Sequence, residues 1–436
     1  MNLLHLCLMT TPELHSLFIK STGVQTDTRA LQPNQLYFAL RGDRFDGHDY
    51  AEAALAQGAL AVVVDRNVGS GDDRCIIVPD VLTALQDLAR YHRIAWGKRV
   101  VGLTGSNGKT TAKELFARVA SRKYNVLATE GNLNNHIGVP LTLLQLKPEH
   151  ELAVVEMGAN HQREIYSLAG MCLPNLGYIT NYGKAHLEGF GGVEGVIKGK
   201  SELYDRLREW NGTALVHTND AAQMSRTEGL ERWTFGTDSH TETPYLSLPS
   251  DEHGFAQIEC AGICVQTHLT GAFQSTNIAA AMALADWLEI NAEEAAAAIN
   301  SYVPSNNRAE WRTTELNRVL LDAYNANPSS TLAALQAFAQ LPNAESPLVV
   351  LGDMFELGEW AAGEHQAILD WVHSNAPHWS VWTVGPLYAA CTRPAKRTFA
   401  TTEEALNELN SAALKGATVL IKGSRGMALE QLLPAL

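Results

Sequence analysis

One short segment of the sequence, TGSNGKTT, has residue types and spacing suited to binding nucleotide phosphates. Its glycines let the backbone turn tightly so that N–H groups face the phosphates, and a following helix would add partial positive charge. Lys109 could then reach the β- and γ-phosphates, and the Thr110 hydroxyl could hold Mg²⁺. The predicted phosphate loop, expected to bind a nucleotide, comprises Thr104, Gly105, Ser106, Asn107, Gly108, Lys109, Thr110 and Thr111.

The loop departs from the general P-loop pattern at one position. That pattern has Gly five residues before Gly108, where this chain has Leu103. A glycine turn with an exposed lysine is therefore the alternative. A strand-like run precedes the segment and a helix-like stretch follows it, and this is the context that a phosphate loop requires, so we favour nucleotide binding.

Two further polar residues follow neighbouring strand-like runs. Glu156 closes the apolar run LAVVE, and His186 lies in GKAHLEGFGG, shortly after the next run ends at Asn181. Because the carboxyl ends of parallel strands meet at one edge of a sheet, we expect both residues near Lys109 and Thr110. Oxygen ligands with one imidazole are a reasonable set for Mg²⁺. The plainer alternatives are a capping or salt-bridged Glu156 and a packed surface His186.

A parallel sheet is needed to bring these residues together, and the sequence predicts one. Short β-branched-rich runs alternate with amphipathic stretches over most of the chain, which is typical of βαβ units. The predicted strands are Val100–Gly105, Leu152–Gly158, Leu176–Asn181 and Thr213–Asn219, then Val319–Asn325, Pro347–Asp353, Val381–Gly385 and Ala417–Gly423. The predicted helices include Lys113–Arg122, Val193–Arg208 and Ser329–Gln340.

The length and one linker suggest the domain organisation. At roughly 150 residues per domain, 436 residues favour about three domains. The polar segment YVPSNNR, residues Tyr302–Arg308, separates the two sets of strands, and the first part of the chain has its own strand-like runs, LYFALRGD and ALAVVVD. We read TDSHTETPYLSLPSDEHG as a surface loop or hairpin. The prediction is an α/β protein with domains at 1–97, 98–308 and 309–436.

Composition excludes several classes of protein. Apolar residues make up 46% and charged residues 18%, as in ordinary globular chains, which excludes disorder and collagen. The net charge of −14 argues against a nucleic-acid partner, although local basic pockets are allowed. The six cysteines include no CxxC pair and are expected to be reduced. Because neither a signal peptide nor a membrane-spanning run is recognisable, we expect a cytoplasmic protein without a membrane span.

The phosphate loop, together with EGNLNNHIGVPLTLL (Glu130–Leu144), EMGANHQREI (Glu156–Ile165) and NYGKAHLEGFGG (Asn181–Gly192), resembles the Mur ligase family of ATP-dependent amide-bond synthetases. Supporting stretches extend the resemblance over the whole chain. They are DTRALQPNQLYFALRGDRFDGHDY (Asp27–Tyr50), DAYNANPSS (Asp322–Ser330), LGDMFELGEWAAGEH (Leu351–His365) and KGSRGM (Lys422–Met427).

The resemblance implies a UDP-sugar domain, a central P-loop ATPase-like domain with a parallel sheet, and a C-terminal Rossmann-like domain for nucleotide and D-Ala-D-Ala. YNANP, GDMFELG and KGSRGM are typical of members that join D-Ala-D-Ala to UDP-MurNAc-tripeptide. In that reaction, ATP converts the tripeptide carboxylate to an acyl phosphate, which the dipeptide amine attacks. The products are UDP-MurNAc-pentapeptide, ADP and phosphate, and the pentapeptide serves peptidoglycan synthesis, cell shape and cell division. Two Mg²⁺ ions, small-molecule substrates and a monomer are expected.

The same resemblance assigns roles to individual residues. The implied metal ligands are Thr110, Glu156, His186 and Lys200, and the family carbamylates the last of these, although spacing alone would predict solvated lysines at Lys198 and Lys200. Lys109, Lys200, His186 and Glu156 are the implied catalytic residues. Asn277 matches a position near the adenine, and Arg308 and Asp322 match positions near the phosphates and ribose. The implied UDP-sugar residues are Asp27, Thr28, Arg29, Asp46, Gly47, His48, Asn134, Asn135 and His136. Asn325, Asn327 and Ser329 are assigned to the D-Ala-D-Ala side.

Three departures from the family pattern are visible. Phe273-Gln274 stands where His-Asn is common, Arg163 replaces a usual Gly, and Asn307 precedes Arg308 where Gly is commoner. None of them falls in the phosphate loop or at the implied metal ligands.

Other functions remain open at this point. A sister ligase adding a different amino acid is the nearest alternative, and a folylpolyglutamate synthase is more distant. A P-loop kinase would phosphorylate a hydroxyl and need no amine. A non-catalytic ATP-binding scaffold is the third alternative, and the departure at Phe273-Gln274 gives it slight support.

Overall fold

The computed structural model describes residues 9–69, 71–342 and 344–436. The N-terminal segment 1–8, with Cys7 and the start of the stretch examined for a signal peptide, lies outside the described residues. The chain forms two compact units. The first comprises Met1–Gly102, Tyr124–Gly158 and Glu164–Leu176, and the second comprises Leu103–Lys123, Ala159–Arg163 and Gly177–Leu436. The domain boundaries 1–97, 98–308 and 309–436 stay a prediction.

The first unit contains a four-stranded parallel sheet with strand order β1-β2-β5-β6. These strands are β1 (Val24–Gln25), β2 (Leu36–Phe38), β5 (Ala61–Val64) and β6 (Cys75–Ile77). A short hairpin of β3 (Arg41–Gly42) and β4 (Phe45–Asp46) leads into η1 (Gly47–Tyr50) and α2 (Ala51–Ala56). The run LYFALRGD thus supplies β2 and β3, and ALAVVVD supplies β5, as predicted.

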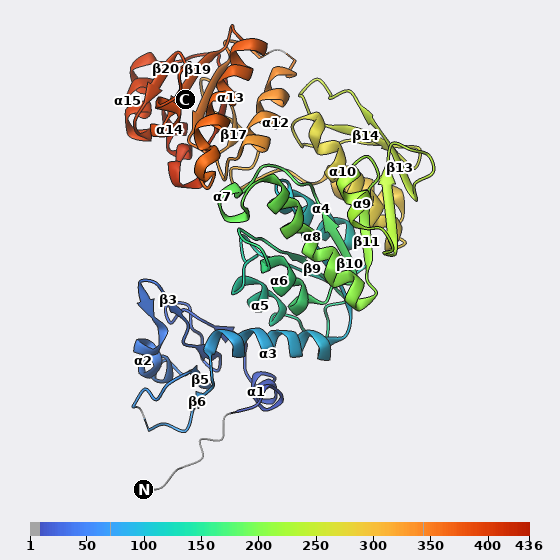
Figure 1. Ribbon diagram of the computed structural model, residues 1–436, viewed down its shortest axis with the longest axis vertical. Coiled ribbons are helices and arrows are strands. Elements are labelled where there is room, and N and C mark those ends of the chain that lie inside the picture. The colour runs from blue at the N-terminus through green and yellow to red at the C-terminus, as the bar shows by residue number, and fades with distance from the viewer. Residues whose placement is uncertain (1–8, 70, 343) are drawn as a thin grey trace. The chain divides into compact units, whose positions relative to one another are not determined.

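The long helix α3 (Val81–Trp96) links this sheet to the rest of the first unit (Figure 1). It packs against α1 (Thr11–Phe18), α5 (Gly138–Leu143) and α6 (Glu164–Cys172). Asp80 caps its N-terminus, and Gly97, with φ 71°, ends it. In the same unit, β8 (Val126–Ala128) pairs in parallel with β9 (Leu152–Glu156), so the predicted strand ending at Glu156 is confirmed.

In the second unit, the strands follow the order β7-β10-β11-β12-β13-β14-β15, with β7 (Arg99–Thr104) and β10 (Leu176–Ile179) each starting in the first unit. The remaining strands are β11 (Thr213–His217), β12 (Arg232–Gly236), β13 (Thr243–Leu248), β14 (Gln257–Cys260) and β15 (Ile263–Val265). Their helices are α4 (Lys109–Ala120), α7 (Leu187–Phe190), α8 (Val193–Trp210), α9 (Ala221–Arg226), η2 (Ala272–Gln274), α10 (Ser275–Trp287) and α11 (Ala292–Asn300).

The edge of this sheet differs from the parallel arrangement predicted. β11, β12 and β13 are parallel, but β13, β14 and β15 form an antiparallel meander. The polar segment read as a surface loop or hairpin supplies β13, the first strand of that meander. The first four residues of β13, 243–246, alternate between buried and exposed. This is the pattern of an antiparallel strand with one solvated face.

The C-terminal part of the second unit is a six-stranded sheet with order β16-β17-β21-β18-β19-β20 (Figure 1). Its strands are β16 (Glu310–Thr313), β17 (Arg318–Asp322), β18 (Leu348–Gly352), β19 (Ser380–Val384), β20 (Arg397–Phe399) and β21 (Thr418–Lys422). Only β16 runs antiparallel to its neighbour; the other described pairs are parallel. All four strands predicted for this region are confirmed, and the α/β fold class with them.

Helices connect the strands of this sheet and pack against it. They are α12 (Pro328–Ala339), η3 (Gly358–Trp360), α13 (Ala361–Asn375), α14 (Pro386–Ala389), α15 (Thr402–Ala412), η4 (Arg425–Met427) and η5 (Leu429–Ala435). Side chains of α15 and η5 join alternate residues of β17, β18 and β21 in one apolar core. Because β21 inserts between β17 and β18, the loops that follow these three strands emerge side by side at their carboxyl ends.

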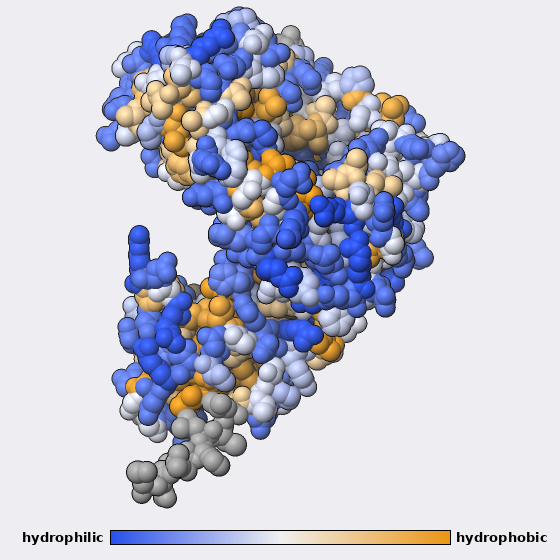
Figure 2. Space-filling view, in the orientation of Figure 1, coloured by the Kyte–Doolittle hydropathy of each residue, from blue (hydrophilic) through white to orange (hydrophobic). Residues whose placement is uncertain are grey.

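Across the described ranges, none of the helices combines the length and apolar character needed to cross a bilayer. Figure 2 shows mainly hydrophilic residues on the visible face of α8 and α9.

Candidate functional site

The phosphate loop has the predicted strand–loop–helix context, since it joins β7 to α4. Gly105, at φ 139°, passes so close to Thr180 that any Cβ would clash with its hydroxyl. Gly108, at φ 79°, caps α4 in the left-handed region that favours glycine. The Lys109 Nζ donates to the carbonyls of Gly105 and Ser106 at 2.9 and 3.1 Å, so its amine lies over the loop rather than in solvent.

Residues at the end of β10 hold the shape of the loop. The Asn181 carbonyl accepts from Ser106 N–H (3.0 Å), and its side-chain oxygen accepts from Asn107 N–H (3.1 Å). The Asn181 amide and the Thr180 hydroxyl both donate to the Asn107 carbonyl, at 2.9 and 2.6 Å. The Ser106 hydroxyl donates to Gly183 O at 2.7 Å. The loop is therefore braced by side chains before any ligand binds.

Asn327 connects the loop to the C-terminal sheet. Its Oδ1 accepts from Ser330 N–H at 2.9 Å and caps α12, while its Nδ2 donates to Asn107 Oδ1 at 2.7 Å. Beside it, Ser329 Oγ accepts from Lys184 N–H at 2.8 Å. The segment assigned to the dipeptide side thus contacts the phosphate loop, and one amide both caps α12 and reaches Asn107 in that loop.

Asn277 lies against the same loop. A Cβ on Gly108 would lie 3.0 Å from the Asn277 amide nitrogen, which donates to Gln274 Oε1 at 2.8 Å. The Phe273 side chain is exposed. The departure from His-Asn to Phe273-Gln274 therefore leaves Asn277 a buried hydrogen-bond partner.

Asp322 begins the DAYNANPSS segment, and Arg308, from the preceding linker, contacts that segment at Tyr324. The Asp322 carboxylate pairs with Lys422 Nζ at 2.9 Å, and this fully buried lysine also donates to Asn325 O at 2.6 Å. The Arg308 guanidinium stacks on the Tyr324 ring, 3.6 Å from its centroid. Sequence reasoning missed Lys422 and Tyr324, although Lys422 closes an apolar strand just as Glu156 does.

Two departures from the family pattern have a conformational explanation. Asn307 and Arg163 adopt φ values of 58° and 71°, in the left-handed region where glycine is favoured. Asn tolerates this region better than most residues. Arg163 is held there by its N–H, which donates to Glu202 Oε1 at 2.6 Å. Both loops therefore keep a backbone that glycine would adopt without strain.

The implied metal ligands have definite partners. Glu156 is buried at the end of β9, in the first unit, where Oε1 accepts from the Asn134 amide at 2.8 Å. Thr110 lies in the first turn of α4. His186, at φ 53°, precedes α7, and its Nδ1 lies 2.5 Å from Glu356 Oε2 in the GDMFELG loop. This hydrogen bond lowers the pKa of Glu356. The motif predicted no such partner for His186.

Within the ranges that the structure describes, no three or more His, Cys, Asp and Glu side chains form a preassembled metal cluster. The implied set still fits Mg²⁺. A buried carboxylate at a strand end and a hydroxyl at a helix N-terminus are hard oxygen donors, and Mg²⁺ needs only one or two carboxylates when substrate phosphates complete its shell.

Lys200 and Lys198 have opposite environments. The Lys200 side chain is fully buried, donates to Ala159 O at 3.0 Å and lies 4.9 Å from the Phe190 ring centroid. Lys198, two residues earlier on α8, is exposed. The interpretation of both as solvated lysines is wrong for Lys200, because the 3.6-residue helical period turns residues two apart to different faces.

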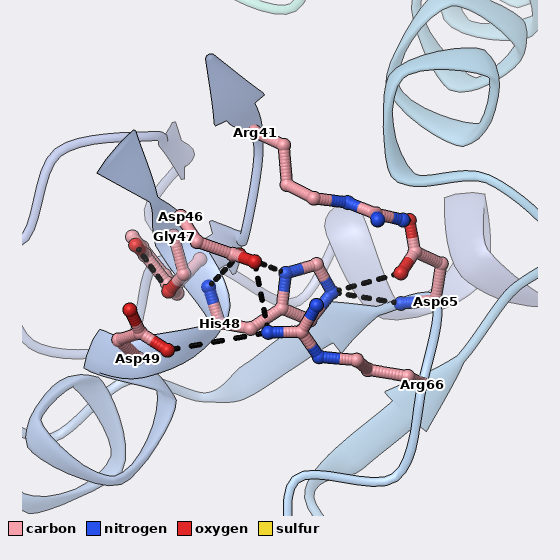
Figure 3. Close-up of polar contacts among 8 residues, drawn as sticks. Arg41, Asp46, Gly47, His48, Asp49, Asp65 and Arg66 are labelled. Carbon is pink, nitrogen blue, oxygen red and sulfur yellow. Dashed lines mark hydrogen bonds and ion pairs between the residues drawn. The ribbon is translucent and has the colours of Figure 1, made fainter. Parts of the chain in front are cut away.

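Three of the implied UDP-sugar residues, Asp46, Gly47 and His48, lie together in the first unit, and the His48 side chain is buried (Figure 3). His48 Nδ1 lies 2.6 Å from Asp46 Oδ1, and its Nε2 lies 3.1 Å from Asp65 Oδ1. Arg66 pairs with Asp46 at 2.8 Å, and Arg41 pairs with Asp65 at 2.5 Å. Burial alone would raise the pKa of Asp46, but hydrogen bonds from the His48 backbone and ring and from Arg66 lower it to about 2. Asp65, Arg66 and Arg41 were not predicted.

Asp27 and Arg29 form a second group, and the charge of Asp27 acts on the nearby Tyr37. Hydrogen bonds from the Arg29 side chain and backbone lower the pKa of Asp27 to about 2. The Tyr37 hydroxyl donates to Gly47 O at 3.0 Å, and burial with the nearby charges of Asp27 and Asp46 raises its pKa to about 12. Thr28, between Asp27 and Arg29, accepts at its carbonyl from Leu31 N–H.

The last three implied UDP-sugar residues shape the loop before α5. Asn135 Oδ1 accepts from the N–H groups of Ile137 and Gly138 at 3.1 and 2.8 Å, and the His136 carbonyl accepts from Gln86 at 2.9 Å. Asn134 holds Glu156, so this loop and the strand end at Glu156 are joined directly.

Comparison with known proteins gives one consistent answer. The family model for the Mur ligase family, catalytic domain, matches residues 20–93; those for the Mur ligase middle domain and the Mur ligase, glutamate ligase domain, match 103–285 and 307–425. The UDP-N-acetylmuramoyl-tripeptide–D-alanyl-D-alanine ligase of Bacillus subtilis (strain 168) is 35% identical over 94% of this chain and 92% of its own. The corresponding ligase of Escherichia coli (strain K12) is 36% identical over 97% and 95%.

Solved structures agree with these relatives. A crystal structure of MurF from Acinetobacter baumannii superposes with a TM-score of 0.86 at 28% identity, covering 98% of both chains. MurF ligase from Thermotoga maritima, in complex with ADP, superposes with a TM-score of 0.84 at 26% identity, covering 96% of this chain and 97% of that one.

Asn327→Ser should weaken ATP binding about fivefold without destabilising the fold, because serine still caps α12 but is too short to reach Asn107. Isothermal titration calorimetry gives the dissociation constant, and urea unfolding gives the stability. Asn291→Ser is the matched control, since Asn291 caps α11 in the same way, through hydrogen bonds to Glu293 and Glu294 N–H. Unchanged ATP affinity in Asn327→Ser would show that the bridge does not brace the loop.

Asp46→Asn should destabilise the protein near neutral pH, and this difference should shrink as the pH falls from about 4 toward 2. A carboxyl whose pKa is lower in the folded state stabilises the protein above its unfolded value, and that stability is lost as the pH falls through the folded value. Urea unfolding at about pH 6 and pH 3 measures it. Asp49→Asn is the control, because the Asp49 side chain is 72% exposed. A constant difference at both pH values would contradict the assignment.

Proposed function

The chain belongs to the Mur ligase family, and we propose that it joins D-alanyl-D-alanine to UDP-N-acetylmuramoyl-tripeptide in an ATP-dependent reaction. One observation carries this proposal: its relatives with that activity match it over nearly the whole length of both chains. The contact between the phosphate loop and the NANPSS segment, through Asn107 and Asn327, supports it, because the reaction needs nucleotide and dipeptide in one site. The enzyme is an ATP-dependent ligase.

The proposed reaction has two steps. The tripeptide carboxylate attacks the γ-phosphorus of ATP, ADP leaves, and an acyl phosphate forms. The neutral amine of the dipeptide then attacks the acyl carbon, and the tetrahedral intermediate collapses to the amide as phosphate leaves and the amine proton is lost. Phosphorylation gives a poor electrophile a good leaving group, and binding all three substrates in one site replaces collision with positioning.

Residues of the phosphate loop manage the charge in the first step. Carboxylate and ATP are both anions, so cationic and N–H groups must offset their repulsion. Lys109 and the N–H groups at the start of α4 are proposed to offset the negative charge of the phosphates. Asn277 is proposed to lie near the adenine, and Arg308 and Asp322 near the phosphates and ribose. Mg²⁺, when bound, neutralises phosphate charge; its proposed ligands are Thr110, Glu156, His186 and carbamylated Lys200.

The surroundings of Lys200 support carbamylation. Complete burial disfavours an ammonium ion, and the neutral amine is the form that adds to CO₂. The carbamate forms a new N–C bond, releases one proton and converts the amine into an oxygen ligand. Phe190 and the Ala159 carbonyl enclose the side chain and leave it little freedom to move.

The first unit is proposed to bind the UDP-sugar through Asp27, Thr28, Arg29, Asp46, Gly47, His48, Asn134, Asn135 and His136. Asn325, Asn327 and Ser329 are proposed to shape the dipeptide side, within domains bounded at 97 and 308. A single chain supplies every residue assigned, which supports a monomer. The soluble nucleotide substrates support a cytoplasmic reaction.

Phosphate release from ATP should require Mg²⁺, UDP-MurNAc-tripeptide and D-Ala-D-Ala together, and mass spectrometry should find UDP-MurNAc-pentapeptide. Lys109→Ala should reduce the rate roughly 10³-fold or more, because it removes charge stabilisation from the transition state. Release that persists without the dipeptide would indicate a kinase or another amine donor. No release from folded, ATP-binding protein would favour a non-catalytic scaffold.

Lys200→Ala should lower the ligase rate at least about 100-fold, and small carboxylic acids such as formate or acetate should restore part of it, since they replace the carbamate oxygens. Steady-state rates with and without added acid test this. Lys198→Ala is the matched control, because Lys198 lies on the same helix and is exposed, and it should keep the parent rate. Folded Lys200→Ala that no acid rescues would count against carbamylation.

A further inference from the structure

Three motif loops converge at the carboxyl ends of adjacent strands in the C-terminal sheet. The loop after β17 carries YNANP, the loop after β18 carries GDMFELG, and the loop after β21 carries KGSRGM. Lys422 Nζ donates to Asn325 O at 2.6 Å, which joins the first loop to the third. Phe355 N–H donates to Ser424 Oγ at 3.0 Å, which joins the second to the third. The three loops therefore form one surface.

This surface is built rigidly. Asp353, at the start of GDMFELG, is buried and accepts from the N–H groups of Leu387 and Tyr388 at 2.9 and 3.0 Å. Ser424 N–H in turn donates to Asp353 O at 3.3 Å, and the Ser424 side chain is buried. These hydrogen bonds fix the backbone of Ser424, and therefore the position at which the next residue, Arg425, leaves the loop.

Arg425 presents an exposed cation on this surface. Its guanidinium lies 5.6 Å from the centroid of the Tyr324 ring, the ring on which Arg308 also stacks. Arg425 is exposed, and its side chain makes no ion pair or hydrogen bond with any residue that the structure describes. Two nearby lysines are engaged, because Lys422 pairs with Asp322 and Lys184 pairs with Glu364. Arg308 forms no ion pair with a described residue either, but it is already assigned to the phosphates and ribose.

An exposed apolar ring packs against the residue that follows Arg425 in the chain. The Phe355 side chain is 42% exposed, an unusual position for a large aromatic residue, and it covers Gly426 so closely that a Cβ there would lie 2.8 Å from its ring. An exposed guanidinium and an exposed aromatic ring on the same loop surface match a small ligand with one carboxylate and short apolar side chains.

Resting on the proposed function, we propose that Arg425 binds the C-terminal carboxylate of D-alanyl-D-alanine, with Phe355 against an alanyl methyl group. The dipeptide carboxylate needs a cation, and the residues assigned to its side, Asn325, Asn327 and Ser329, are all uncharged. Guanidinium pairs bidentately with carboxylate, and this geometry fixes orientation as well as charge. An extended dipeptide spans only about 7 Å. If Arg425 holds its carboxylate, the dipeptide amine therefore lies about 7 Å away, beyond the loop surface.

The test compares D-alanyl-D-alanine with its amide, D-alanyl-D-alaninamide, on the full-length enzyme. The parent enzyme should prefer the carboxylate by roughly 10- to 150-fold in kcat/KM, the range for a charged hydrogen bond. Arg425→Gln should lose that factor on the carboxylate substrate, chiefly through KM for the dipeptide. Its rate with the amide and its KM for ATP should stay within about threefold of the parent. Arg425→Lys should retain part of the preference.

The control variant is Arg393→Gln, an exposed arginine on the same domain that should keep the full preference. Thermal unfolding of each variant checks that it is folded. If Arg425→Gln keeps the parent preference for the carboxylate, the assignment is wrong while the proposed function stands. If the parent enzyme does not consume D-alanyl-D-alanine at all, the proposed function fails and this assignment fails with it.

Discussion

The hydrogen bond from Asn327 to Asn107 is the constraint on which the second unit's site depends, because it joins the phosphate loop to the C-terminal sheet. The same Asn327 side chain caps α12, so the position of the amide follows from the helix that begins beside it. Asn107 is itself held by Thr180 and Asn181 at the end of β10. A series of side-chain hydrogen bonds thus connects the two sheets, so movement of either sheet would shift the phosphate loop.

Charge is distributed unevenly in a way that suits anionic substrates. The chain has a net charge of −14, yet Lys109, Lys422 and Arg425 lie at or just beyond the ends of strands in the second unit, and Arg308 lies just before β16. Two of these are fixed by partners: Lys422 by Asp322 and Asn325, and Lys109 by loop carbonyls. Arg308 and Arg425 instead both lie near the Tyr324 ring. Fixed cations shape the loops, while stacked arginines keep their N–H donors available for ligands.

Much of the site was predictable because its chemistry lies in contiguous residues. TGSNGKTT predicted both the turn and the helix that follows, and the strand ending at Glu156 lies where the apolar run LAVVE placed it. The sequence showed Arg163 and Asn307 as departures from a usual glycine, but only the structure showed that both adopt positive φ values. The antiparallel β14 and β15 were missed, because short edge strands carry little hydrophobic periodicity.

By itself, the sequence determined the α/β class, the phosphate loop and the identity of the residues at each strand end, since local sterics and hydrogen bonding act between near neighbours in the chain. Only the tertiary structure decided which of those residues meet. Lys422 is buried against Asp322 because β21 lies between β17 and β18. The same strand order sets Arg425 just beyond the end of β21, where it has no ion pair with a residue that the structure describes. Glu356 pairs with His186 because the loop after β18 meets the loop after β10. Strand order depends on how distant apolar faces pack together, and no contiguous stretch of residues encodes that choice.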